Sequence, residues 1–258
     1  MSRKEANTGD WLAGVNPVLE QLRRDPRAIR KVVVARGASG GAAEVAEQAR
    51  RAGLEVERED ARRLHELVRG VAHQGVVALM RGYQYADWHD LVARKPACLL
   101  LADQVTDPRN FGALVRSADA TGVGGVVIPQ DRSVSVTAVV AKAAAGATAF
   151  VAISRVVNLA RALEELKRTG YWIVGLDGAA TQNLFEFSFP ERCALVVGAE
   201  GRGLRPLTRA KCDHLISIPM VGRVGSLNVS VAAAVALYER FRQAASRESR
   251  EGVNGLTP

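Results

Sequence analysis

The sequence predicts an α/β protein of two domains, the second of them built on a mainly parallel sheet. Runs rich in valine, leucine and isoleucine alternate with segments of helical periodicity along most of the chain, and glycines end many of these segments. Strands separated by helices are typical of parallel sheets. With 258 residues, 48% of them hydrophobic, the chain is long enough to bury one large core or two smaller ones.

The first domain is predicted to cover residues 1–82. Val15, Val18, Leu19 and Leu22 have the spacing of one helix face, and KVVVARG is a short β-branched run that ends at a glycine. The expected segments are helix 14–25, strand 31–37, helix 40–53, strand 54–60, helix 61–70 and strand 71–82. Residues 83–97 are mixed in character and include Pro96, so they are predicted to form a linker.

The second domain is predicted to cover residues 98–246, beginning with the buried strand ACLLLADQV. The polar residues 247–258 that follow it are expected to be disordered. The expected segments are strand 97–105, helix 110–122, strand 124–129, helix 135–147, strand 150–156, helix 158–170, strands 171–178 and 193–201, helix 205–213, strand 214–220 and helix 228–247.

The net charge and the composition of the chain favour a cytoplasmic protein with a polyanionic partner. A net charge of +8 points first to nucleic acid, although a protein that is merely basic has the same charge. The three cysteines lack CxxC spacing and the four histidines are scattered, so neither a disulfide framework nor a metal site is expected. Residues 1–10 contain no apolar segment, so no secretory signal is expected. Lys142 and several alanines interrupt the longest weakly polar stretch, residues 134–153, so no membrane span is expected.

Three loops are candidates for the chemistry, because ligands of open α/β sheets bind beyond the carboxyl ends of the strands. They are residues 103–120, 198–204 and 218–232. The second, GAEGRGL, has the glycines of a phosphate loop, but it matches neither a Walker motif nor the order of a dinucleotide fingerprint. Glu200 would also repel a diphosphate. The glycines are alternatively explained by a tight turn alone.

Taken together, the three loops resemble the three motifs of the SpoU branch of the SPOUT methyltransferases. The motifs are present here, in the same order and spacing, as DPRNFGALVRSADA, VVGAEGRGL and ISIPMVGRVGSLNVSVA. In the first domain, GVNPVLEQL and VAHQGVVALM resemble the bacterial 23S rRNA guanosine 2′-O-methyltransferases of this branch. One departure is the string GRVG before SLN, where related sequences carry small residues or serine.

The resemblance implies a C-terminal domain with a deep trefoil knot that binds S-adenosylmethionine, and a homodimer with its site near the subunit interface. It implies that residues 1–82 are a small α/β RNA-binding domain of the L30e/L7Ae type. The implied reaction is 2′-O-methylation of a guanosine ribose in 23S rRNA, at the peptidyl-transferase P-loop by analogy. The residues expected to line the cofactor pocket are Gly198, Gly201, Ile218, Met220 and Leu227.

The resemblance also gives Arg116 the catalytic role, assisted by Asn110, Glu200, Ser226 and Asn228. Arginine is normally always protonated. Two roles are therefore open for Arg116: a base, or a clamp on the adjacent phosphate that stabilises the developing alkoxide. Glu200 is expected to face Arg116.

Each of these residues also has an ordinary explanation. Arg116 alone has the character of a solvated helix residue, and Asn110, or Asn228 with Ser226, is a candidate helix N-cap. The last helix has one apolar row for the core and a second, at Val231 and Val235, for a partner subunit. Basic residues of the first domain are expected to contact RNA, or else simply to be solvated; they are Arg23, Arg24, Arg27, Arg30, Lys31, Arg50, Arg51, Arg62 and Arg63.

Three other functions remain open. A tRNA ribose methyltransferase is the nearest, although members of that type have short terminal extensions in place of a separate first domain. A non-catalytic rRNA-binding or ribosome-assembly factor is the second, and the intact motif residues argue against it. A dinucleotide oxidoreductase is the third, and it lacks the required fingerprint.

Overall fold

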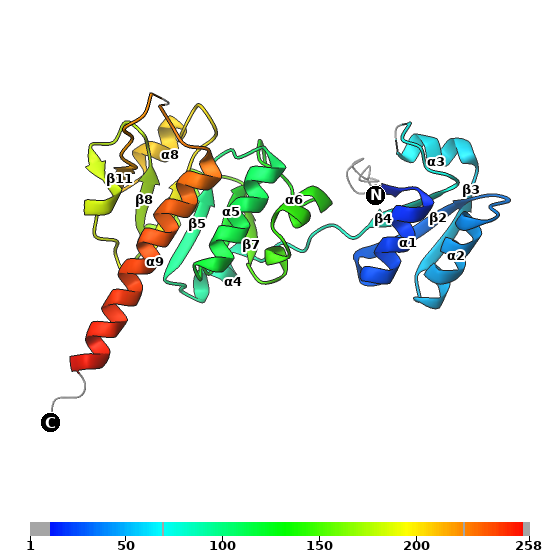
Figure 1. Cartoon of the computed structure of the whole chain (residues 1–258), viewed down its shortest axis with the longest axis horizontal. Helices are drawn as coiled ribbons and strands as arrows, with labels where there is room; N and C mark the ends of the chain where they lie inside the picture. The colour runs from blue at the N-terminus through cyan, green and yellow to red at the C-terminus, as the bar shows by residue number, and fades with distance from the viewer. Residues whose placement is uncertain (1–10, 69, 224, 255–258) are drawn as a thin grey trace. The chain divides into compact units, whose positions relative to one another are not determined.

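The computed structural model describes residues 11–68, 70–223 and 225–254 (Figure 1). The chain divides into two compact units, Met1–Tyr83 and Gln84–Pro258. Residues 1–10, in which no apolar signal segment is expected, lie outside the described residues.

The first unit is a four-stranded sheet with helices on both faces. Strand β2 lies between β3, to which it is parallel, and β4, to which it is antiparallel, and β1 pairs with the other edge of β4. Helices α1 and α2 pack on one face of the sheet, and α3 packs on the other. The elements are β1 (Trp11–Ala13), α1 (Val15–Arg24), β2 (Ile29–Ala35), α2 (Gly41–Arg51), β3 (Glu55–Glu59), α3 (Ala61–Leu67) and β4 (Val76–Met80).

The HQG string before β4 holds the start of α1. Gln74 has a left-handed backbone (φ 49°), and its side-chain Oε1 accepts a hydrogen bond of 3.1 Å from the Val15 N–H. His73 Nδ1 accepts one of 3.1 Å from the Gly75 N–H. The bond from Val15 satisfies a helix N–H that has no partner within its own helix. The string therefore has a structural role inside the first unit.

The second unit is built on a seven-stranded sheet in the order β7-β6-β5-β10-β8-β11-β9, and all pairings among its described strands are parallel. The predicted parallel sheet is thus confirmed. Its strands are β5 (Cys98–Ala102), β6 (Val126–Pro129), β7 (Ile153–Val156), β8 (Trp172–Leu176), β9 (Gln182–Asn183), β10 (Cys193–Val197) and β11 (His214–Ser217).

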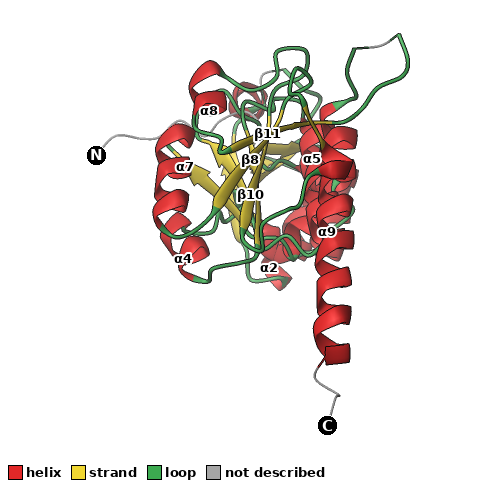
Figure 2. Ribbon diagram, turned by 90° about the vertical axis from the view of Figure 1, so that its left-hand side faces the viewer, coloured by secondary structure: helices red, strands yellow, loops and turns green. Residues whose placement is uncertain are grey.

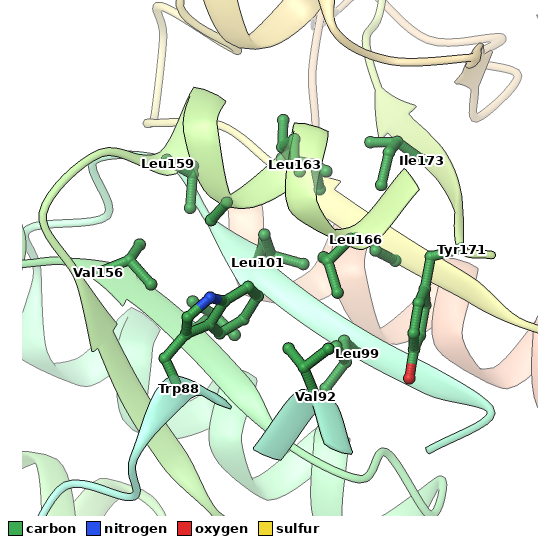
Figure 3. Close-up of a cluster of buried hydrophobic side chains, with 14 of the residues drawn as sticks. Trp88, Val92, Leu99, Leu101, Val156, Leu159, Leu163, Leu166, Tyr171 and Ile173 are labelled. Atoms are coloured by element: carbon green, nitrogen blue, oxygen red, sulfur yellow. The ribbon is translucent and has the colours of Figure 1, made fainter. Parts of the chain in front are cut away.

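Helices cover both faces of this sheet (Figure 2). Helix α5 contacts α6 and α9 on one face, whereas α4 and α7 pack on the other, where α8 contacts α7. The core beneath α4 and α7 includes Trp88, Leu99, Leu101, Leu163 and Ile173 (Figure 3). The helices are α4 (Trp88–Ala93), α5 (Pro108–Ala120), α6 (Ala138–Ala143), α7 (Leu159–Arg168), α8 (Pro206–Ala210) and α9 (Val229–Asn254).

Two α-helical segments were not predicted as helices. Part of the predicted linker is helix α4, which belongs to the second unit because Trp88, Leu91 and Val92 are buried in its core and Trp88 Nε1 donates to Glu165 over 2.9 Å. The predicted disordered tail is helical as far as Asn254, since α9 continues through residues 247–254. Residues 255–258 lie outside the described residues.

Candidate active site at the carboxyl edge of the sheet

The three motif loops follow strands β5, β10 and β11, whose carboxyl ends share one edge of the parallel sheet. At the first loop, Asp107 is the N-cap of α5: its Oδ1 accepts from the N–H groups of Arg109 (2.8 Å) and Asn110 (2.9 Å). The prediction that Asn110 caps this helix was wrong. Because Asp107 satisfies the backbone, the Asn110 side chain is available for contacts with another loop.

Asn110, Glu200 and Asn228 form one hydrogen-bonded cluster, which brings together the three motifs. The Nδ2 groups of Asn110 and Asn228 each donate to Glu200 Oε1 over 2.7 Å, and Asn228 Nδ2 also lies 3.0 Å from Asn110 Oδ1. Two amides thus fix one carboxylate oxygen and leave Oε2 without a hydrogen-bond partner among the described residues. The arrangement holds a negative charge in place at the surface of the domain.

Asn228 also starts the last helix, as predicted. Its Oδ1 accepts from the Ser230 N–H at 2.9 Å and from the Ser230 hydroxyl at 2.6 Å. Because the oxygen is bound to the first turn of α9, the Nδ2 group must face the other side, where Glu200 lies. Helix capping and the orientation of the amide are therefore linked.

The loop that carries Glu200 depends on its glycines. Ala199 and Gly203 exchange two backbone hydrogen bonds, of 3.0 and 2.9 Å, around a turn in which Gly201 (φ 71°) and Gly203 (φ 64°) are left-handed. A Cβ on Gly198 would lie 2.0 Å from the Gly203 carbonyl carbon. Only glycine permits this close approach, so the loop geometry that presents Glu200 requires Gly198.

Asp103 and Arg205 join the loop 103–120 to the loop 198–204, and neither residue was predicted from the sequence. Asp103 is fully buried at the end of β5 and binds Arg205 in three ways: the backbone N–H at 3.0 Å, Nε at 2.6 Å and Nη2 at 2.6 Å. The two guanidinium nitrogens share Oδ1 and the backbone N–H donates to Oδ2, and charge-assisted bonds of this kind are stronger than neutral hydrogen bonds. The sequence does contain a signal for Asp103, since this acidic residue directly follows the five apolar residues of β5.

Arg116 and Ser226 do not join the cluster. Arg116 is exposed on α5, six residues after Asn110, which corresponds to about 9 Å along the helix and about 240° around it. Ser226 is exposed in the loop before α9. Among the described residues, no hydrogen bond or ion pair joins Arg116 or Ser226 to Glu200. Glu200 therefore faces two amides in this chain, and the expectation that it faces Arg116 is not met.

The residues expected to line a cofactor pocket lie at the same edge. Ile218 is half-buried, whereas Met220 and Leu227 expose 41% and 36% of their surface. A Cβ on Gly222 or Gly225 would meet no atom within 4 Å, so neither glycine is required by a close contact. Val224, within the unusual GRVG string, lies outside the described residues.

The described part of the chain contains no group of three or more His, Cys, Asp or Glu side chains placed to hold a metal ion. Nor does any helix within it combine the length and apolar character needed to cross a membrane.

Two family models cover most of the chain. The SpoU rRNA Methylase family matches residues 97–238, and the RNA 2′-O ribose methyltransferase substrate-binding domain matches residues 11–86. The chain belongs to the SpoU rRNA methylase family. The predicted membership is confirmed, and the three loops that meet at Glu200 lie within the matched region.

Relatives of this SpoU methylase are similar over nearly their whole length. It is 45% identical to the 23S rRNA (guanosine-2′-O-)-methyltransferase RlmB of Bordetella pertussis, over 90% of this chain and 96% of the relative. It is 39% identical to the putative TrmH family tRNA/rRNA methyltransferase YacO of Bacillus subtilis, over 91% and 96%. Among solved structures, the SpoU methyltransferase AviRb of Streptomyces viridochromogenes, in complex with AdoMet, matches with a TM-score of 0.61 at 27% identity, covering 92% of this chain and 90% of that one.

Proposed function

We propose that the protein transfers a methyl group from S-adenosylmethionine to the ribose 2′-oxygen of a guanosine in 23S rRNA, at the peptidyl-transferase P-loop. The observation that carries the proposal is the Asn110–Glu200–Asn228 cluster, in which the three family motifs meet. The naming of the RlmB relatives supports the 23S substrate, since they align over nearly their full length. We assign the protein to the cytoplasm, where this RNA is made.

The site is compatible with S-adenosylmethionine, which supplies a methyl group already activated on a positively charged sulfonium. Glu200 disfavours a phosphate but tolerates a cation. The backbone of the loop at Gly198 and Gly201 and the apolar side chains of Ile218, Met220 and Leu227 would hold the cofactor, because an adenine is bound well by apolar contacts and backbone amides.

The ribose hydroxyl is the weak partner of the reaction, since it must be oriented and must lose its proton. We assign to Arg116 the clamping of the adjacent phosphate and the stabilisation of the developing alkoxide, because a guanidinium stays protonated and suits phosphate. Glu200 accepts a hydrogen bond from the nucleotide. Asn110 and Asn228 hold Glu200 in place, and Ser226 contacts the nucleotide from the loop before α9.

A homodimer would complete the site. Val229, Ala233 and Leu237 of α9 are buried, whereas Val231, Tyr238 and Phe241 are about half exposed. Tyr238 and Phe241 border an apolar groove together with Phe185. We propose that a second copy covers this groove. Arg116 would then act at the subunit interface, which agrees with its separation from Glu200 within one chain.

We also propose that the C-terminal domain is knotted. The chain leaves β11 near one edge of the sheet and returns to its middle, where Asn228 contacts Asn110 and Glu200 and α9 packs against α5. A knot requires a return of this kind, because the last segment of the chain must pass through an earlier loop.

We propose that the first unit is an L30e/L7Ae-type domain that binds the rRNA. Several of its basic side chains pair with neighbouring acids: Lys31 with Glu57, and Arg51 with Glu47, for example. By contrast, Arg23, Arg24, Arg27 and Arg30 form no ion pair among the described residues. These four are therefore the arginines of the unit that we assign to RNA contact.

The test is to incubate the protein with labelled S-adenosylmethionine and either unmodified 23S rRNA fragments or tRNA, and to map ribose methylation. Label at a guanosine of the 23S P-loop is expected. Label in tRNA alone would overturn the substrate, and RNA binding without label in either would indicate an assembly factor. The Arg116→Ala variant is expected to lose activity, and full activity in this variant would contradict the role of Arg116.

A further inference from the structure

The loop 130–137, which joins β6 to α6, is hydrogen-bonded to Tyr85, at the start of the second unit, and to Arg155 of β7. The Tyr85 hydroxyl accepts a hydrogen bond of 2.9 Å from the Val136 N–H. Arg155 donates from Nη2 to Ser135 Oγ over 2.6 Å, and its guanidinium carbon lies 4.0 Å from the centroid of the Tyr85 ring. Tyr85 is itself fixed, since the next residue, Ala86, pairs with the edge strand β7.

The other side of the loop 130–137 is bonded to the first motif loop. The Val134 N–H donates to the Val105 carbonyl over 3.1 Å, and Ser133 Oγ lies 3.4 Å from the same oxygen. Val105 is buried two residues before Asp107, the N-cap that sets the position of Asn110. The loop 130–137 thus lies beside the segment that carries the catalytic cluster.

Each of the two joined loops holds a non-glycine residue in the left-handed region: Gln104 (φ 62°) and Arg132 (φ 55°). A glycine would adopt this conformation at lower cost. Such residues persist only where the surrounding structure fixes them, and they occur preferentially at ligand sites. The left-handed backbone at Arg132 is therefore that of a loop whose neighbours fix its shape.

Arg132 exposes its positive charge to solvent. Its side chain is exposed, and it forms no ion pair within the described part of the chain; the same is true of Arg109 in the first turn of α5. The adjacent Asp131 is exposed and forms no ion pair with Arg132. A guanidinium is a planar fork that binds phosphate oxygens in pairs. Strands β5 and β6 are neighbours in the sheet, so Arg109 and Arg132 follow adjacent strand ends.

We propose that the loop 130–137 is a preformed contact surface for the RNA backbone, in which Arg132 binds a phosphate near the nucleotide that is methylated. The class of ligand is a phosphodiester chain, and the contact is independent of base sequence. The inference rests on the proposed function for the identity of the RNA. Tyr85 is a positioning residue, since it acts on the loop and not on the RNA.

The experiment measures equilibrium binding of a 23S rRNA P-loop fragment over a series of salt concentrations, for the wild-type protein, Arg132→Ala and Arg161→Ala. Arg161 is a matched control because it is an exposed arginine of α7 with no ion pair among the described residues. Arg132→Ala should bind more weakly and should lose about 0.7–0.9 from the slope of log K against log salt, the value of one phosphate contact. The KM for RNA should rise while the affinity for S-adenosylmethionine is unchanged.

Two further variants separate charge from loop structure. Asp131→Asn removes a negative charge beside the proposed phosphate and should tighten binding. Tyr85→Phe keeps the ring under Arg155 but removes the acceptor for Val136. It should raise the KM for RNA with the salt slope preserved, because Arg132 is still present.

Equal binding and equal salt slopes for Arg132→Ala and Arg161→Ala would overturn the inference. If the wild-type protein binds the fragment but methylates no rRNA, the proposed function fails, and a reduced salt slope in Arg132→Ala would still support the contact surface. If the wild-type protein methylates rRNA and Arg132→Ala matches the control, only the contact surface fails.

Discussion

Asn228 and Glu200, from different motif loops, are joined by a hydrogen bond of 2.7 Å from the Asn228 side-chain amide to Glu200 Oε1. The same oxygen accepts from Asn110, also at 2.7 Å. Since the Asn228 oxygen is bound to the first turn of α9, the amide cannot be reversed without losing the helix cap. The position of the carboxylate is therefore tied to the start of the last helix.

Replacement of Asn228 by aspartate should separate capping from catalysis. Aspartate caps helices as well as asparagine does, but it would place a second carboxylate where the amide now donates to Glu200. We expect kcat to fall about 100-fold or more while the melting temperature changes little. Because adjacent carboxylates raise the pKa of one of them, part of the activity should return as the pH is lowered toward about 5.

The control is Asn228→Ser, which keeps a capping oxygen and removes the amide donor without adding charge. It should lose less activity than Asn228→Asp and show no recovery at low pH. Equal losses in the two variants, with identical pH profiles, would show that charge repulsion at Glu200 is not the cause.

Gly198→Ala should disrupt the loop that presents Glu200, because its Cβ would lie 2.0 Å from the backbone of Gly203. We expect a loss of about 1–3 kcal/mol in the free energy of unfolding and a large loss of affinity for S-adenosylmethionine. Gly201→Ala is the matched control, since Gly201 is left-handed but a Cβ there meets open space. It should cost only about 1 kcal/mol. Denaturant unfolding and calorimetric titration would measure both, and equal effects would contradict the steric argument.

Much of the fold was predictable because burial leaves a periodic trace in the sequence. The apolar runs at β5 and β10 are buried over their full length, and each of the seven other strands expected from the sequence has a counterpart. The short strands β1 and β9 were not predicted, because their pairing depends on neighbours distant in the chain. Helix α4 was missed for a similar reason: only the tertiary environment of Trp88 distinguishes a buried helix from a polar linker.

For the site, the motifs predicted the three residues that meet, Asn110, Glu200 and Asn228. They did not predict that Glu200 binds two amides in preference to Arg116. Helical geometry alone separates Arg116 from Asn110, since six residues turn a helix by about 240°. The Asp103–Arg205 pair was not predictable from spacing, because 102 residues separate its members.

The Asp103–Arg205 pair should be most sensitive to removal of its arginine. Arg205→Ala would leave the fully buried Asp103 without its guanidinium partner, whereas Asp103→Asn leaves an arginine that already reaches solvent. Breaking a buried pair costs about 3–5 kcal/mol, and the partial exposure of Arg205 reduces this to about 2–3 kcal/mol. Urea unfolding should show that the double variant Asp103→Asn/Arg205→Ala is more stable than Arg205→Ala alone. A double variant no more stable than Arg205→Ala would contradict this.

Cys212 should make the protein less stable at alkaline pH. Burial raises the pKa of its thiol to about 12, whereas the thiol of an unfolded cysteine has a pKa of about 8.5. Below about pH 8.5 both states keep the proton and the thiol has no effect. Above it the unfolded state loses the proton first, so the free energy of unfolding falls by up to about 1.4 kcal/mol per pH unit until the folded pKa is reached. Tyr171, whose pKa burial also raises to about 12, begins to contribute only above about pH 10. Urea unfolding can be measured at about pH 8, 9 and 10, on either side of the pKa of the unfolded thiol. The free energy of unfolding should decline less steeply with pH for Cys212→Ser than for the wild type. Parallel declines would show that this thiol does not control the effect.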